Sequence, residues 1–220
     1  MTIGMILLII VAILILLGVG QRILDRLRLN DKAALVFIAL ILVLGFVPDI
    51  RVTPVFAFNL GGAVVPLALC IYLFIKADTA WERWRCILAS LATGAAIFAI
   101  GWLSPDEPET ITVDPIILYG LAAGLIAYLF GRSRRCAFIA GVTGMMLSNT
   151  ANAVYVWSKG VEQDFVLGGA GAFDGIIVAG LVGVLLAELL GEIIERMKRG
   201  TQRPTRIFRN GEFVKEEEAK

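Results

Sequence analysis

The sequence predicts an all-α integral membrane protein with about seven membrane-spanning helices, its N-terminus outside the cell and its C-terminus inside. Two compositional observations predict this class: 58% of the 220 residues are hydrophobic and only 18% are charged. An average soluble domain carries about 25% charged residues. The third observation is that the apolar residues fall in runs separated by charged stretches, and such runs suit helices that cross about 30 Å of hydrocarbon.

The seven predicted spans are apolar runs bounded by polar or charged segments. They cover residues 3–20, 33–47, 61–75, 86–103, 115–130, 136–157 and 165–190. Pro48, Pro54 and Pro66 flank the junction of the short second and third spans, which allows a broken or re-entrant segment there. We therefore expect residues 1–199 to form a multi-pass domain in the cell (cytoplasmic) membrane, with the lipid bilayer as its main partner.

Positive charge predicts the orientation of the chain. Of the 20 Lys and Arg residues, all but Arg51 and Lys159 lie in the first, third and fifth connections or in the C-terminal tail. Connections that stay in the cytoplasm retain positive charge during membrane insertion. The sequence therefore places these connections and the tail inside the cell, and the other three connections outside.

Residues 200–220 are predicted to be a cytoplasmic tail that contains a short hairpin. The pair Asn210-Gly211 favours a two-residue turn with positive φ angles. Such a turn would pair residues of the two flanking apolar stretches as follows: Arg209 with Glu212, Phe208 with Phe213 and Ile207 with Val214. An isolated hairpin is marginally stable in water, so this one needs the membrane surface or a partner protein.

Residue types that the chain lacks exclude several kinds of chemistry. It contains no histidine, which removes Ser-His-Asp catalysis and His-ligated zinc. Its three cysteines, Cys70, Cys86 and Cys136, have no metal-type spacing. We therefore expect no metal, no cofactor and no nucleic-acid partner.

The candidate ligand site consists of polar residues in the predicted spans, where an unpaired polar group is costly. Asp174 lies within the seventh predicted span, and Asn149 and Asn152 lie three residues apart on one face of the sixth. With Asn59 as a further partner, these residues predict an outward-facing polar pocket for a small solute or ion. A hydrogen-bond cluster that only joins two helices is the alternative.

A short repeat and several glycines suggest close packing. Leu-Gly-Gly-Ala occurs at residues 60–63 and again at 167–170, which would relate spans one to three to spans five to seven around a linking fourth, a parallel 3+1+3 repeat. Glycines at these positions allow close helix contact or an unwound backbone: Gly61, Gly62, Gly168, Gly169, Gly171 and Gly175. Small residues four apart, as at Gly120 and Gly124, favour tight helix packing within one chain or in a homo-oligomer.

The stretch Asn-Leu-Gly-Gly-Ala-Val-Val-Pro that ends at Pro66 and the stretch Gly-Gly-Ala-Gly-Ala-Phe-Asp-Gly-Ile that ends at Ile176 carry a family resemblance. They resemble a prokaryotic membrane family known as domain of unknown function 1614. The resemblance spans the second to the seventh predicted helix. It implies a polytopic membrane domain, and it brings no assigned reaction.

A looser resemblance keeps an enzyme function open. Residues 171–174, Gly-Ala-Phe-Asp, are similar to the Gly-x-hydrophobic-Asp motif of intramembrane aspartyl proteases and prepilin peptidases. That chemistry would use Asp174 together with a second acid, Asp49 or Asp114. Three functions thus remain open: transport or binding of a small solute or ion, which the sequence favours, intramembrane proteolysis, and a membrane scaffold whose tail binds a cytoplasmic partner.

Overall fold

The structure is a computed structural model that describes residues 13, 31–77, 79–103, 115–131, 133–171, 174–199, 206–209 and 212–215. The predicted first span apart from residue 13, the candidate acid Asp114 and the predicted turn at residues 210–211 lie outside these residues. The chain divides into two compact units, Met1–Ala187 and Glu188–Lys220, which are described separately.

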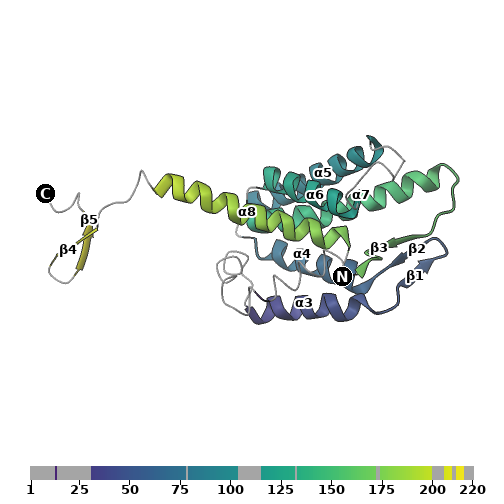
Figure 1. Ribbon diagram of the computed structural model, residues 1–220, viewed down its shortest axis with the longest axis horizontal. Helices are drawn as coiled ribbons and strands as arrows, with labels where there is room; N and C mark the ends of the chain where they lie inside the picture. Colours follow the sequence, from purple (N-terminus) through teal and green to yellow (C-terminus); the bar gives the residue numbers. More distant parts are fainter. Residues whose placement is uncertain are drawn as a thin grey trace. The chain divides into compact units, whose positions relative to one another are not determined.

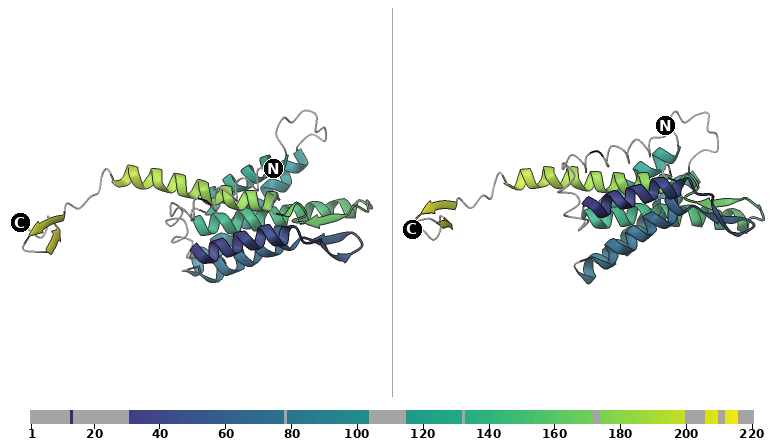
Figure 2. Two further views of the ribbon diagram at one scale, coloured as in Figure 1. Left: turned by 60° about the horizontal axis from the view of Figure 1, so that its bottom comes forward. Right: turned by 90° about the horizontal axis from the view of Figure 1, so that it is seen from below.

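The first unit is mostly helical, as the sequence predicts. Its helices are α3 (Asp31–Gly45), α4 (Val65–Ile75), α5 (Ala80–Leu103), α6 (Pro115–Gly131), α7 (Arg134–Ser158) and the first half of α8 (Gly175–Arg199). A five-residue π-helix, η1 (Leu60–Val64), leads directly into α4. Figures 1 and 2 show α3 to α7 and the start of α8 side by side in one bundle.

Helices begin where the sequence supplies caps. Ser133 precedes α7, and its hydroxyl accepts a 3.1 Å hydrogen bond from the Cys136 N–H. Thr79 does the same before α5, where its Oγ1 accepts from the Glu82 N–H at 3.1 Å. Each cap satisfies one of the backbone N–H groups that the first turn of a helix leaves without a partner.

One helix in the described part of the chain, Ala80–Leu103, is long and apolar enough to cross a membrane. Shorter apolar helical stretches cover Lys32–Gly45, Leu60–Ile75, Tyr119–Phe130 and Gly175–Gly191. The second to sixth predicted spans therefore each coincide with a helix, although their ends differ by several residues.

A small three-stranded sheet lies at one end of the bundle, and the sequence analysis did not predict it. Its strands are β1 (Ile50–Thr53), β2 (Phe56–Phe58) and β3 (Phe165–Leu167). β1 and β2 form an antiparallel hairpin, and β2 pairs with β3 in parallel, with Phe58 opposite Leu167. The parallel pairing lays the two Leu-Gly-Gly-Ala motifs next to each other (Figure 1).

The predicted seventh span, residues 165–190, needs correction at its start. Residues 165–167 are a strand, and the helix begins only at Gly175. Between them Gly168 and Gly171 have φ angles of 70° and 58°, which a helix cannot contain. The apolar character of Phe165, Val166 and Leu167 serves strand pairing here, and a run of hydrophobic residues alone cannot distinguish the two structures.

Small residues let the helices approach closely. A methyl group added at Gly120 or Gly124 of α6 would meet Val178 or Val182 of α8, and one added at Gly141 of α7 would meet the Ala179 backbone. The small-residue spacing in α6 is thus used within the chain. The bundle core includes large, fully buried side chains, among them Leu73, Cys86, Cys136, Val142 and Ile176.

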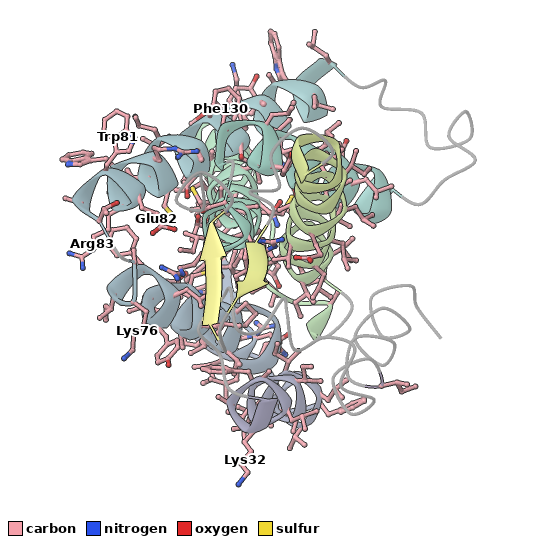
Figure 3. All side chains as sticks on the ribbon, turned by 90° about the vertical axis from the view of Figure 1, so that its left-hand side faces the viewer. Lys32, Lys76, Trp81, Glu82, Arg83 and Phe130 are labelled. Atoms are coloured by element: carbon pink, nitrogen blue, oxygen red, sulfur yellow. The ribbon has the colours of Figure 1, made fainter. Side chains whose placement is uncertain are left out.

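The opposite end of the bundle gathers charged residues. The buried Arg135 side chain, at the start of α7, donates to the Lys76 carbonyl at 3.0 Å and lies 3.4 Å from Glu82 at the start of α5. Figure 3 views this end and labels Glu82 and Arg83, with Lys76 on the neighbouring helix and Lys32 farther away. The structure therefore brings together segments whose Lys and Arg the sequence assigns to one side of the membrane.

The second unit contains the end of α8 and a two-stranded antiparallel sheet formed by β4 (Arg206–Arg209) and β5 (Glu212–Lys215). The paired residues are Arg206 with Lys215, Ile207 with Val214, Phe208 with Phe213 and Arg209 with Glu212. This register leaves two residues, 210 and 211, to connect the strands, as in the pairing that the sequence suggests.

Candidate functional site

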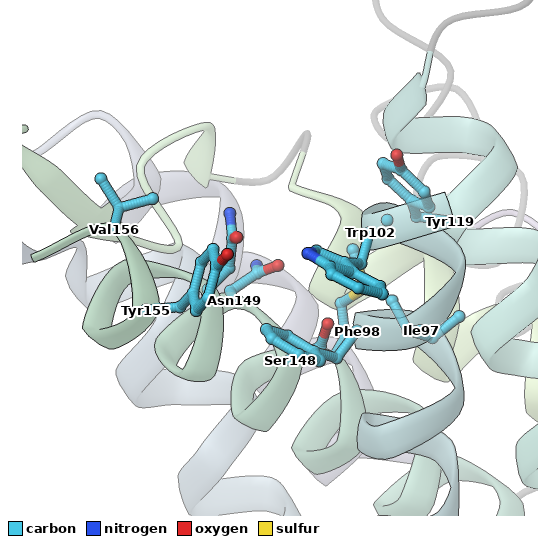
Figure 4. Close-up of a pocket in the computed structure, with 11 residues that line it drawn as sticks. Ile97, Phe98, Trp102, Tyr119, Ser148, Asn149, Tyr155 and Val156 are labelled. Atoms are coloured by element: carbon cyan, nitrogen blue, oxygen red, sulfur yellow. The ribbon is translucent and has the colours of Figure 1, made fainter. Parts of the chain in front are cut away.

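The candidate site is a cavity of about 440 Å³ between α5, α6 and α7 (Figure 4). One wall is the face of α7 that carries Ser148, Asn149 and Asn152, spaced so that all three point to the same side of the helix. The end of α5 and Tyr119 of α6 form the facing wall. The volume falls within the range of small-molecule sites, about 300 to 1,000 Å³.

The polar side chains of this cavity are available to a ligand. Among the described residues, neither the Ser148 hydroxyl nor the Asn149 and Asn152 amides form a hydrogen bond to the protein. Ser148 is buried, Asn149 is half-buried and Asn152 is exposed. An amide offers two donors and an acceptor and a hydroxyl offers one donor and two acceptor sites, so the wall is suited to hydrogen bonding with a bound molecule.

Four aromatic rings contribute apolar surface to the cavity. Phe98 and Trp102 come from α5, Tyr119 from α6 and Tyr155 from α7. The Phe98 and Tyr155 rings meet edge to face with centroids 6.4 Å apart, which fixes their orientation. The sequence analysis missed these residues, but a signal existed: Tyr155 lies three residues after Asn152, hence on the same face of the helix.

A second cavity of about 110 Å³ adjoins the first on the side of β3. The two share Asn149, Asn152 and Val156, and the smaller one adds Asp164 and Phe165. Asp164 is exposed and lies 3.8 Å from Arg51, with the side chains 67% and 73% exposed. The carboxylate that lines the smaller cavity thus belongs to a solvated surface ion pair.

Asp174, the predicted centre of the site, lines neither of these cavities. It lies just before α8, outside the helix, where its carboxylate accepts from the Ile176 N–H at 3.0 Å and the Ala170 N–H at 3.4 Å. Its burial raises the pKa of the carboxyl above the ordinary value, and the two N–H bonds oppose that shift. The contacts make Asp174 the N-terminal cap of α8.

The side chain of Asn59 also stabilises the fold. It is buried, only 3% exposed, and its Oδ1 accepts from the Gly62 N–H at 2.9 Å, so it caps η1. Its Nδ2 donates to the Asp49 carboxylate at 2.9 Å and to the Val47 carbonyl at 3.3 Å. The amide is therefore fully used in tying the β1–β2 corner to the bundle, in contrast to the amides of Asn149 and Asn152.

Two of the acids that proteolysis would need, Asp49 and Asp174, also make hydrogen bonds that stabilise the fold. Asp49 accepts from Asn59, and Asp174 caps α8, so each carboxylate stabilises a local backbone arrangement. Asp114, the other candidate second acid, lies outside the described residues. Within the described residues no group of three or more acidic, cysteine or histidine side chains could hold a metal ion.

The fold and the site together define a helical bundle with an apolar helix of membrane-spanning length and a polar cavity at one end. A family model described as protein of unknown function (DUF1614) matches residues 23–186. That match covers most of the chain, so the protein belongs to this family. No curated protein and no solved structure matches it.

Proposed function

We propose that the protein is a multi-pass membrane protein that binds a small solute in the cavity beside Asn149 and Asn152, as a transporter or channel does. The observation that carries this proposal is the contrast between the amides of the chain: Asn59 makes three hydrogen bonds inside the protein, whereas Asn149 and Asn152 make none to a described residue. Unpaired amides that face a cavity of ligand size are suited to bind rather than to hold the fold together.

The surface of α5 supports placement in a bilayer. Leu88 and Leu91 are 58% and 55% exposed, and the tryptophans near its ends, Trp81, Trp84 and Trp102, are also exposed. A buried helix of a soluble protein would cover such residues with other elements. Lipid covers them at no cost, and tryptophan prefers the two interfaces of a membrane.

The proposed orientation places the cavity on the outer side. The charged end formed by Lys76, Glu82, Arg83 and Arg135 belongs to connections that the positive-inside rule assigns to the cytoplasm. The cavity lies at the other ends of α5 and α7, beside the β-sheet.

Cysteine labelling tests this proposal. Asn152→Cys and Glu162→Cys should react with a membrane-impermeant maleimide on intact cells, whereas Arg134→Cys and Asn210→Cys should react only after permeabilisation. The native cysteines are buried and give a low background. Labelling of position 210 on intact cells would reverse the orientation. Labelling of position 162 without position 152 would show that solutes outside do not reach the cavity.

A scaffold would behave differently. If the cavity serves no solute, Asn149→Ala and Asn152→Ala should leave every cellular phenotype of the gene unchanged, while deletion of residues 200–220 should abolish it. If the cavity binds a solute, the two asparagine variants should affect the phenotype more strongly than the deletion does.

A further inference from the structure

We infer that the ligand of this cavity is a neutral solute that carries several hydroxyl groups, such as a sugar or a polyol. The inference rests on the proposed function and specifies the chemistry of the same site. It departs from the expectation of a pocket in which Asp174 and the asparagines together bind a small solute or ion, because Asp174 does not line this cavity.

Among the described residues that line the larger cavity, none is ionisable in the neutral pH range. An ion that contacts only these residues loses hydration without gaining a counter-charge from them, and that loss costs several kcal/mol or more. Uncharged hydrogen-bonding groups do not incur this penalty.

The polar groups of the cavity are spread along α7. Ser148 and Asn152 are four residues apart on α7, about 6 Å along the helix axis, with Asn149 between them. A single ion cannot pair with both the donors and the acceptors of these groups, because a cation contacts only their oxygens and an anion only their N–H and O–H groups. A solute with several hydroxyl groups can, and each hydroxyl donates and accepts at once, which matches amides that offer both functions.

The wall opposite the amides carries aromatic rings. Phe98, Trp102 and Tyr119 present aromatic surface across from the amides. The ring of a sugar has polar edges and faces covered with C–H groups, so it can lie with its hydroxyls toward α7 and a C–H face against the aromatic rings. A strongly apolar ligand would leave the amides without hydrogen-bond partners. Such a ligand therefore binds weakly to a polar site.

The test measures the thermal stability of full-length protein in lipid nanodiscs with millimolar solutes from three classes. The neutral class contains glucose, sorbitol and myo-inositol, the cationic class tetramethylammonium and potassium, and the anionic class acetate and phosphate. Each solute is tested on the wild type, Asn149→Ala, Asn152→Ala and the control Thr150→Val. Thr150 lies between the two asparagines but does not line the cavity, and its hydroxyl bonds to the Met146 carbonyl at 2.8 Å.

We expect at least one neutral solute to raise the melting temperature of the wild type and of Thr150→Val, with at least tenfold weaker binding to each asparagine variant. A deoxy analogue of that solute should bind more weakly, because it leaves an amide unpaired. A charged solute whose binding depends on Asn149 and Asn152, without any effect of the neutral class, would overturn the inference and keep the proposed function. If no solute of any class acts through these asparagines, both are overturned.

Discussion

Gly62 and Gly168 meet backbone to backbone, so that a methyl group added at Gly62 would collide with the Gly168 carbonyl oxygen. The two residues belong to the two Leu-Gly-Gly-Ala motifs, which the sequence analysis connected only by their similarity. The contact follows from the parallel pairing of β2 with β3, and the Asn59 N–H adds a 2.9 Å hydrogen bond to the Leu167 carbonyl.

This contact predicts that Gly62→Ala strongly destabilises the protein, by about 3 kcal/mol or more, because backbone atoms cannot move aside as a flexible side chain can. Unfolding can be followed with a thiol-reactive fluorophore, since Cys70, Cys86 and Cys136 are buried in the folded chain. Gly101→Ala is the control, because a methyl group there meets nothing within 4 Å. Equal melting temperatures for the two variants would contradict the close contact.

Substitution by alanine should reduce stability strongly at Asn59, whose amide is hydrogen-bonded within the fold, and only slightly at Asn152. Asn59→Ala removes the cap of η1 and leaves a buried N–H of Gly62 unpaired, which should cost about 2 to 4 kcal/mol. Asn152→Ala removes an exposed amide without a described partner and should change stability by less than about 0.5 kcal/mol. Thermal unfolding of both variants beside the wild type decides this, and a large loss for Asn152→Ala would show that its amide is structural.

Asp174→Asn should stabilise the protein at neutral pH. Because burial raises the pKa of Asp174 in the folded protein, the unfolded chain ionises first as pH rises above about 4, and stability falls until the folded pKa is passed. Asparagine caps a helix about as well and cannot ionise. The difference in melting temperature between variant and wild type should therefore grow from pH 4 toward neutrality. A variant that is less stable than the wild type at pH 7 would refute this.

The buried Arg135–Glu82 ion pair should contribute more to the free energy of unfolding than the exposed Arg51–Asp164 pair. Arg135 is 5% and Glu82 is 19% exposed, so Glu82→Ala leaves a buried guanidinium without its carboxylate and should cost about 3 to 5 kcal/mol. Asp164→Ala breaks the exposed contact with Arg51 and should cost less than about 1 kcal/mol. Unfolding measured at low and high salt tests both, and comparable losses would mean that the Arg135 pair is hydrated.

The sequence allowed the helices to be predicted because their signals are local. The apolar runs and the charged connections each act within a few residues of the chain, as do the caps that the structure shows at Thr79 and Ser133. The face shared by Asn149 and Asn152 follows from the helical period alone, and these residues do line one cavity.

The sheet and the position of Asp174 depend on contacts that are distant in sequence. Phe165, Val166 and Leu167 read as the start of a helix until β2 is known to lie beside them. With the helix start displaced to Gly175, Asp174 becomes a cap instead of a carboxylate inside a span. The same limit applies to Asn59, whose partners Asp49 and Val47 become neighbours only when the chain turns at β1 and β2.

The pairing of β2 with β3 also has a consequence for biogenesis. Roughly a hundred residues separate the two strands, so β2 leaves the ribosome well before its partner exists. Until β3 arrives, the nascent chain exposes an open strand edge and an unpaired Asn59 N–H. A product truncated before residue 165 keeps that edge unpaired, and an unpaired strand edge makes an incomplete chain prone to aggregation.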